Sequence, residues 1–225
     1  MKGIVSRLVS AVLVAGGIVT ASTAAFAVTD VSNHSITCNT VSGTATFRPP
    51  LNATGTAGMQ IIIKGKLADC IDNTDAGVLI DSGTFSGTLG DPSSFCPDFI
   101  TTFQAPVVET GSLTFRWKAN RTTPIRPTQS RQVVNSRTSD LYNAAAGVEP
   151  FTTGGTFGSS KYVTLSFGTA SVTGAFTGGD AGASSSNIIV SRETFHLIHT
   201  LCDVGVPPAT GFKTLNFAIG TVTLQ

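Results

Sequence analysis

Charged residues are scarce in this chain of 225 residues: they make up 12% of it, and the formal net charge is +1. Soluble domains contain about 25% charged residues on average, so roughly half of the usual charge is missing. A net charge this small argues for no particular charged partner, and no nucleic-acid reader motif is present, so we expect no nucleic acid. The hydrophobic fraction of 41% excludes a disordered chain, which would be poorer in apolar residues and more highly charged.

The motifs of common catalytic sites are also absent from the sequence. It contains no Gly-x-Ser-x-Gly elbow, no Ser-x-x-Lys, no His-Glu-x-x-His and no phosphate-binding loop. No Cys-x-x-Cys or Cys-x-x-His spacing indicates zinc. We therefore expect no cofactor and no enzymatic activity. The alternative is an unrecognised catalytic site, in which scattered carboxylates such as Glu109, Glu149 and Glu193 would face each other across a cleft.

Residues 1–27 have the pattern of a secretory signal peptide. Lys2 and Arg7 give a positive start, residues 8–19 are mostly apolar, and Ala-Phe-Ala at 25–27 supplies the small residues of a cleavage site. A retained membrane anchor is the alternative, but the apolar run is short for a span. Removal of Lys2 and Arg7 reduces the 14 basic residues to 12, against 13 acidic ones. We expect residues 28–225 to be secreted as a single β domain.

The cysteines, Cys38, Cys70, Cys96 and Cys202, are even in number. In an exported chain they predict two disulfides, and their pairing is not determined by the sequence. We favour Cys70 with Cys96, which would bracket one hairpin and its following loop. Cys38 with Cys202 would then tie the first strand to a late one.

Alternation of apolar and polar residues predicts β-strands along most of residues 28–225. The clearest strands are 58–68, 112–119 and 161–177. Residues 120–138 are the least regular stretch, and residues 139–147 have the features of one short helix. Turns rich in Gly, Asn and Asp join about 8–10 strands, so we expect an antiparallel β-sandwich or a closed β-barrel with at most one short helix.

A Gly-Thr unit recurs along the chain, beginning at Gly43, Gly83, Gly168 and Gly220. At three of these glycines the apolar alternation changes phase; in the last strand, for example, one apolar face ends at Ile219 and resumes at Val222. An extra residue in one strand produces such a slip, and glycine tolerates the conformation that it requires. We expect these units to mark bends in long strands.

An acidic turn is a candidate metal site. Asp69, Asp72, Asn73 and Asp75 precede Gly77, and their oxygens are of the kind that binds calcium. Their spacing does not match the EF-hand loop, and no bidentate glutamate follows. Asp and Asn are also common turn residues. We expect a simple turn and keep a calcium site at Asp72 and Asp75 as the alternative.

Positive charge is concentrated between Glu109 and Asp140, where no acidic residue occurs. In the strand at 112–119, Arg116 and Lys118 share the outward face, because apolar residues take the inward positions. Such a patch can hold an anionic polymer or a lipid headgroup, and arginine favours planar anions. The alternative is a solvated face followed by a loop. The candidate anion-binding residues are Arg116, Lys118, Arg121, Arg126, Arg131 and Arg137.

Four stretches stand out together: residues 43–47, 64–70, 114–117 and 211–224. They are structural rather than catalytic motifs. With them, the chain resembles a loose group of exported actinobacterial β proteins of unknown function. The resemblance implies export and a β fold, and it transfers no functional residue.

These observations favour an exported, non-enzymatic protein that binds a ligand or associates with the cell envelope. The basic stretch makes an anionic envelope polymer or lipid the expected partner. An alternative from another class is a subunit of an oligomeric envelope pore, because strands that alternate apolar and polar residues also suit a membrane β-barrel. In that case the apolar faces would point at lipid.

Overall fold

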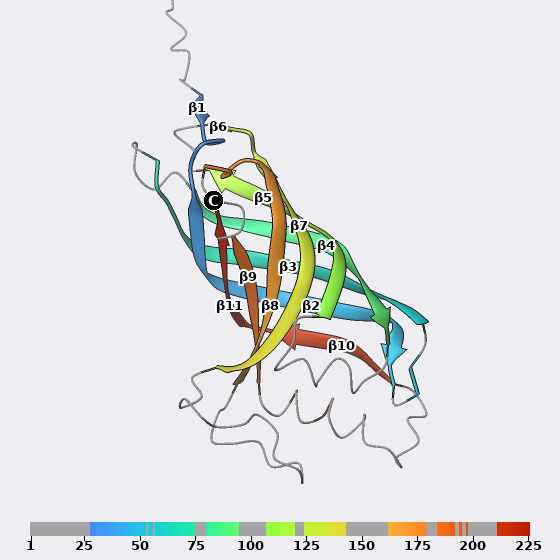
Figure 1. The fold of residues 1–225 in the computed structure, drawn as a ribbon. Helices are drawn as coiled ribbons and strands as arrows, with labels where there is room; N and C mark the ends of the chain where they lie inside the picture. Colours follow the sequence, from blue (N-terminus) through green and yellow to red (C-terminus); the bar gives the residue numbers. More distant parts are fainter. Residues whose placement is uncertain are drawn as a thin grey trace, which may run out of the picture.

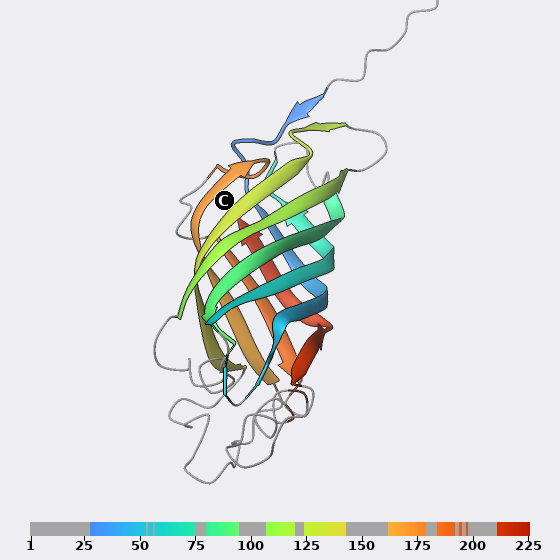
Figure 2. The ribbon, with the colours of Figure 1, turned by 90° about the vertical axis from the view of Figure 1, so that its right-hand side faces the viewer.

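Eight antiparallel strands close into a barrel in which each strand pairs with its neighbours in the sequence (Figures 1 and 2). A computed structural model shows the order β2 (Ile36–Leu51), β3 (Ala57–Asp72), β4 (Ile80–Ser93), β5 (Val107–Ala119), β7 (Gln129–Tyr142), β8 (Tyr162–Gly174) and β9 (Ser185–Ser191). The last strand consists of β10 (Phe212–Phe217) and β11 (Ile219–Leu224), which both pair with β2 and so close the ring. The predicted all-β fold is confirmed, and the barrel is the architecture formed.

The structure describes residues 28–52, 54–55, 57–74, 80–94, 107–119, 124–142, 162–178, 184–191, 194, 197 and 211–225. The predicted signal peptide, residues 1–27, lies outside this part of the chain. None of the described residues belongs to a helix long and apolar enough to span a membrane.

A separate parallel pair, β1 (Thr29–Asp30) and β6 (Ile125–Arg126), lies at one end of the barrel (Figure 1). Val31 follows β1 and is fully buried, as is Phe176. The backbone N–H of Phe176 donates to the carbonyl oxygen of Val31 at 2.9 Å. Apolar side chains therefore cover this end of the barrel.

Aromatic side chains fill much of the barrel interior. The rings of Phe85 and Phe115 lie 5.8 Å apart between centroids, and those of Phe115 and Trp117 lie 5.7 Å apart. The indole N–H of Trp117 donates to Ser130 Oγ at 2.8 Å, which satisfies its buried donor. An eight-stranded barrel is just wide enough for such side chains.

A small apolar cavity lies in the interior, beside Phe47, Phe167 and Arg137. Its volume is about 10 Å³, which is close to the least that holds a single water molecule. At this place between the described strands, the interior therefore has no room for a ligand.

Two glycines face each other inside the barrel, Gly43 of β2 and Gly65 of β3. A Cβ atom on Gly65 would lie 2.4 Å from the ring of Phe85 and 2.5 Å from the backbone oxygen of Ser42. Because both positions lack side chains, Phe85 and Phe217, from the flanking strands, approach to 6.4 Å between centroids. Gly43 marks this close approach and no bulge, since the pairing of β2 with β3 continues through it.

The phase changes predicted at Gly83 and Gly220 lie beside these glycines rather than at them, whereas a register shift of β7 falls opposite Gly168 and Thr169. The register of β4 against β5 shifts just before Gly83, between Ile80 and Ser82. In the last strand the interruption falls at residue 218, so Ile219 points outward and is 42% exposed, contrary to the prediction. Gly220 takes the inward position, where a Cβ atom would lie 2.3 Å from a backbone oxygen of β9.

One disulfide joins Cys38 and Cys70, which are direct partners in the pairing of β2 with β3. The predicted pairings of Cys70 with Cys96 and of Cys38 with Cys202 are therefore wrong. The register of the β2–β3 hairpin decides which sulfur atoms meet, and this register cannot be read from cysteine spacing. Cys96 and Cys202 lie outside the described residues.

The strand β7 occupies most of the stretch that looked least regular in the sequence. Its register against β8 shifts at two places, between Val133 and Val134 and between Val134 and Ser136, which breaks the simple alternation. The short helix predicted for residues 139–147 is wrong at its start, because β7 continues as a strand to Tyr142. Residues 143–147 lie outside the described part of the chain.

The glycine pair yields a stability prediction. Gly65→Ala should destabilise the barrel by about 1–3 kcal/mol, because the new Cβ atom would overlap backbone atoms that cannot move aside. Gly90→Ala on β4 is the matched control, since its Cβ atom would lie 3.4 Å from the nearest atom. Urea unfolding midpoints measure both, and equal midpoints would contradict the close approach at Gly65.

Candidate anion-binding site

Four cations lie on the outer face of β3 and β5. Alternation along β3 turns Lys64 and Lys66 outward, and alternation along β5 turns Arg116 and Lys118 outward. All four side chains are exposed, while the inward positions between them hold buried residues such as Phe115. The packing of the barrel interior therefore fixes which way these cations point.

The strand between them, β4, contributes short hydroxyl side chains. Thr84 pairs with Lys66 on one side and with Arg116 on the other. A hollow of about 300 Å³ lies here, because long basic side chains border short ones. We call this surface the basic channel, and its residues are Lys64, Lys66, Ser82, Thr84, Ser86, Arg116 and Lys118.

The cations of the basic channel have no carboxylate partner within the described part of the chain, where both ion pairs are made by Arg137. The carboxylate next to the channel in sequence is Asp81, which accepts a hydrogen bond from Ser82 Oγ at 3.1 Å. Asp69, on β3, accepts a hydrogen bond from Thr40. The channel therefore keeps uncompensated positive charge and, apart from the Ser82 hydroxyl, unused side-chain donors, which is the requirement for binding an anion.

Three of the six predicted residues share this outer surface. Arg116 and Lys118 belong to the channel, and Arg131 of β7 is exposed on the same side of the sheet, one strand beyond β5. Arg126 is exposed but lies in β6, at the end of the barrel. Arg121 lies outside the described residues.

Lys64 and Lys66 fall outside the predicted set, although they form one wall of the channel. Clustering along the sequence could not find them, because β3 and β5 are far apart in the chain. The available signal was the alternation of residues 58–68, which already turns both lysines outward. Pairing of the two strands with β4 was the missing information.

Arg137 does not belong to the outer surface, and its prediction as an anion-binding residue is wrong. Its side chain is 1% exposed. On β7, Gln132 points inward and Arg131 outward, and unbroken alternation would place residue 137 outward as well. The register shift between Val134 and Ser136 inserts an extra residue, which reverses the facing of the strand.

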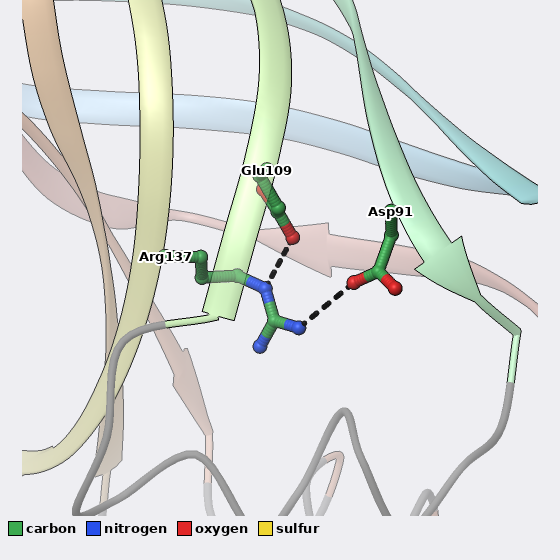
Figure 3. Close-up of polar contacts among 3 residues, drawn as sticks. All are labelled: Asp91, Glu109 and Arg137. Carbon is green, nitrogen blue, oxygen red and sulfur yellow. Dashed lines mark hydrogen bonds and ion pairs between the residues drawn. The ribbon is translucent and has the colours of Figure 1, made fainter.

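Inside the barrel, Arg137 binds two carboxylates (Figure 3). Its Nε donates to Oε1 of Glu109, and one of its terminal nitrogens donates to Oδ2 of Asp91 at 3.2 Å. The side chains of Glu109 and Asp91 are 0% and 4% exposed. One buried guanidinium thus ties together β4, β5 and β7.

Glu109 is the unbalanced member of this cluster. Its Oε2 atom is buried and has no hydrogen-bond partner among the described residues. Burial raises the pKa of Glu109 above its ordinary value of 4.5, which the positive charge of Arg137 opposes only in part. Asp91 adds to the rise, so a proton on Glu109 relieves buried negative charge.

The acidic turn uses its oxygens to hold the backbone. Asp72 is buried, and its carboxylate accepts the backbone N–H groups of Thr74 and Ile80, each at 3.1 Å. Asn73 Oδ1 accepts the backbone N–H of Ser35 at 2.7 Å. No cluster of three or more metal-binding side chains occurs among the residues that the structure describes, and Asp75 lies outside them. These contacts support the turn, and calcium stays an untested alternative.

Comparison of the chain with protein-family models, with curated proteins and with solved structures finds no match. The assignment of the site therefore depends on the geometry of the barrel alone. The resemblance to exported actinobacterial β proteins stays a prediction.

The two arginines of β7 give a matched pair of variants. Arg137→Leu should destabilise the protein by about 3–5 kcal/mol, because it leaves two carboxylates buried without their cation. Arg131→Leu removes the same charge from an exposed position and should change stability by no more than about 0.5 kcal/mol. Similar urea midpoints for the two variants would place Arg137 outside the barrel.

Glu109 predicts a pH dependence of stability. Because its pKa is raised in the folded state, its protonated form stabilises the fold below pH 4.5, and this contribution is lost as the pH rises through the folded pKa. Glu109→Gln mimics the protonated side chain and lacks this titration. The wild type should therefore lose stability relative to Glu109→Gln as the pH increases from 4.5. Parallel urea midpoints of the two proteins across this range would contradict the raised pKa.

Proposed function

We propose that residues 28–225 form an exported, non-enzymatic binding protein of the cell envelope, which holds an anionic ligand in the basic channel. One observation carries this proposal. Three exposed cations, Lys66, Arg116 and Lys118, line one hollow beside Ser82 and Thr84, and they have no carboxylate partner in the described part of the chain. Lys64 continues the same outer face on β3. An anionic envelope polymer or lipid headgroup is the class of ligand that such a surface recognises.

The strands preorganise the basic channel for binding. Lys66 and Arg116 flank Thr84 in one cross-strand row, and the filled interior fixes the backbone beneath them. A ligand therefore meets groups whose positions are already set, which reduces the entropy lost on binding. The guanidinium of Arg116 adds planar, two-pronged donation to phosphate or carboxylate oxygens.

Two further observations support an exported, surface-binding role. The disulfide between Cys38 and Cys70 is typical of proteins from oxidising compartments, which agrees with the predicted signal peptide. The interior of the described strands is filled, so binding at the outer face is favoured over binding inside the barrel.

The direction in which the apolar side chains point favours the binding protein over the pore subunit. The apolar faces of the strands, including Ile63, Leu67 and Phe115, point into the barrel and are buried. The outward positions of β3 and β5 carry lysines and arginines, whereas a membrane barrel presents an apolar band to lipid.

The enzyme hypothesis now has a specific carboxylate pair, Asp91 and Glu109. Asp91 borders an open hollow of about 430 Å³, which residues of β3, β4 and β5 line. Glu109, however, is fully buried, and both carboxylates are occupied by Arg137. A cluster closed in this way favours a role in stability over contact with a substrate.

Binding to anionic cell-wall fragments tests the proposal. Wild-type protein, residues 28–225, should bind them at low salt and lose affinity as salt increases. Each Lys or Arg near an anionic surface contributes about 1 kcal/mol, so Lys66→Ala with Arg116→Ala should raise the Kd about thirtyfold.

Arg126→Ala with Lys213→Ala is the matched control. It removes the same charge from exposed positions outside the channel and should leave the Kd within about threefold of the wild type. Binding that does not depend on salt, or equal losses in the two double variants, would contradict a site in the basic channel.

A further inference from the structure

The anion-binding positions of the basic channel are arranged in a line along β4. Ser82, Thr84 and Ser86 point outward at every second residue, so they are spaced about 7 Å apart. Each has at least one cation as its partner on a neighbouring strand. The pairs are Ser82 with Lys118, Thr84 with both Lys66 and Arg116, and Ser86 with Lys64.

The channel has the width of one extended chain. Lys66 of β3 and Arg116 of β5 are separated by β4 alone, so their backbones lie about 10 Å apart. Between them the surface carries only short side chains. A flat or branched anion would not be contacted from both sides at successive positions, whereas a linear one would.

We propose that the ligand is a linear polymer of short polyol units joined by phosphodiesters, bound along β4 with successive phosphates at Ser82, Thr84 and Ser86. This inference rests on the proposed function and names the ligand class of the same channel. At Thr84 and Ser86 the phosphate accepts a hydroxyl hydrogen bond from β4 and pairs with a cation of β3 or β5. At Ser82, whose hydroxyl donates to Asp81, the phosphate pairs with Lys118. The neutral polyol units span the intervals between these positions.

Two other anionic ligands fit the channel less well. Single-stranded nucleic acid needs aromatic side chains on which its bases stack, but Phe85, Phe115 and Trp117 all point into the barrel and are buried. A lipid surface favours a basic face with apolar side chains that insert. None of the exposed large apolar residues of the described strands, such as Ile71 and Val108, lines the channel.

Calorimetric titration of residues 28–225 with linear glycerol phosphate oligomers tests the inference. The oligomers contain one to six units. Affinity should rise about fivefold with each added phosphate up to three and then level off, because the channel holds three positions. Thr84→Tyr fills the channel and keeps all four cations, so it should weaken binding of the three-unit oligomer at least about tenfold. Thr84→Val, which removes only the hydroxyl, should weaken it about fivefold.

The controls separate this inference from the proposed function. Anionic phospholipid vesicles and oligothymidylate should bind more weakly than the six-unit oligomer, and vesicle binding should not respond to Thr84→Tyr. Tighter binding of either control, or an oligomer affinity unchanged by Thr84→Tyr, overturns the phosphodiester polymer while the anion-binding function stands. Absence of binding to every anionic probe, cell-wall fragments included, overturns both.

Discussion

An eight-stranded barrel is only as wide as the side chains that fill it, and this constraint governs the whole molecule. Because Gly43 and Gly65 have no side chains, the rings of Phe85 and Phe217 can approach each other above this pair. The packed core leaves a cavity of about 10 Å³ beside Phe47, and Lys64, Lys66, Arg116 and Lys118 point outward. The register of the strands arranges these cations on the outer face, which is where we propose the ligand site.

Arg137 differs from the exposed cations because its side chain points into the barrel. A charge in this position needs buried partners of opposite charge. A buried ion pair seldom stabilises a fold beyond what an apolar core would give, but the loss of one partner is strongly destabilising. Here a register shift on β7 turns the arginine inward, and two carboxylates from β4 and β5 receive it. We infer that the cluster fixes the register of these three strands, since a slip of one residue would separate the three charges.

Local patterns were enough to predict the fold class but not the pairings. Alternation in residues 58–68 and 112–119 correctly identified strands and their inward faces, because the side-chain period of a strand is local. The disulfide, the facing of Arg137 and the position of Ile219 all depend on cross-strand register, which the sequence does not display. For the site, Arg116 and Lys118 could be found from one strand, whereas Lys64 and Lys66 join them only through β4.

Because the chain has few charged residues and a net charge near zero, its net charge does not predict a class of binding partner. The strands β8, β9 and β11 contain no charged residue, whereas β3 and β5 carry the cations of the channel. Two acidic residues, Asp69 of β3 and Asp81 of β4, are exposed nearby in sequence. A net charge near zero produces little attraction at distances beyond the screening length of about 8 Å at physiological salt. The recognition that we propose for the channel therefore depends on contact, through the spacing of Lys66, Thr84 and Arg116. A ligand whose charges match that spacing gains over one that is merely anionic, because the strands cannot rearrange to meet it.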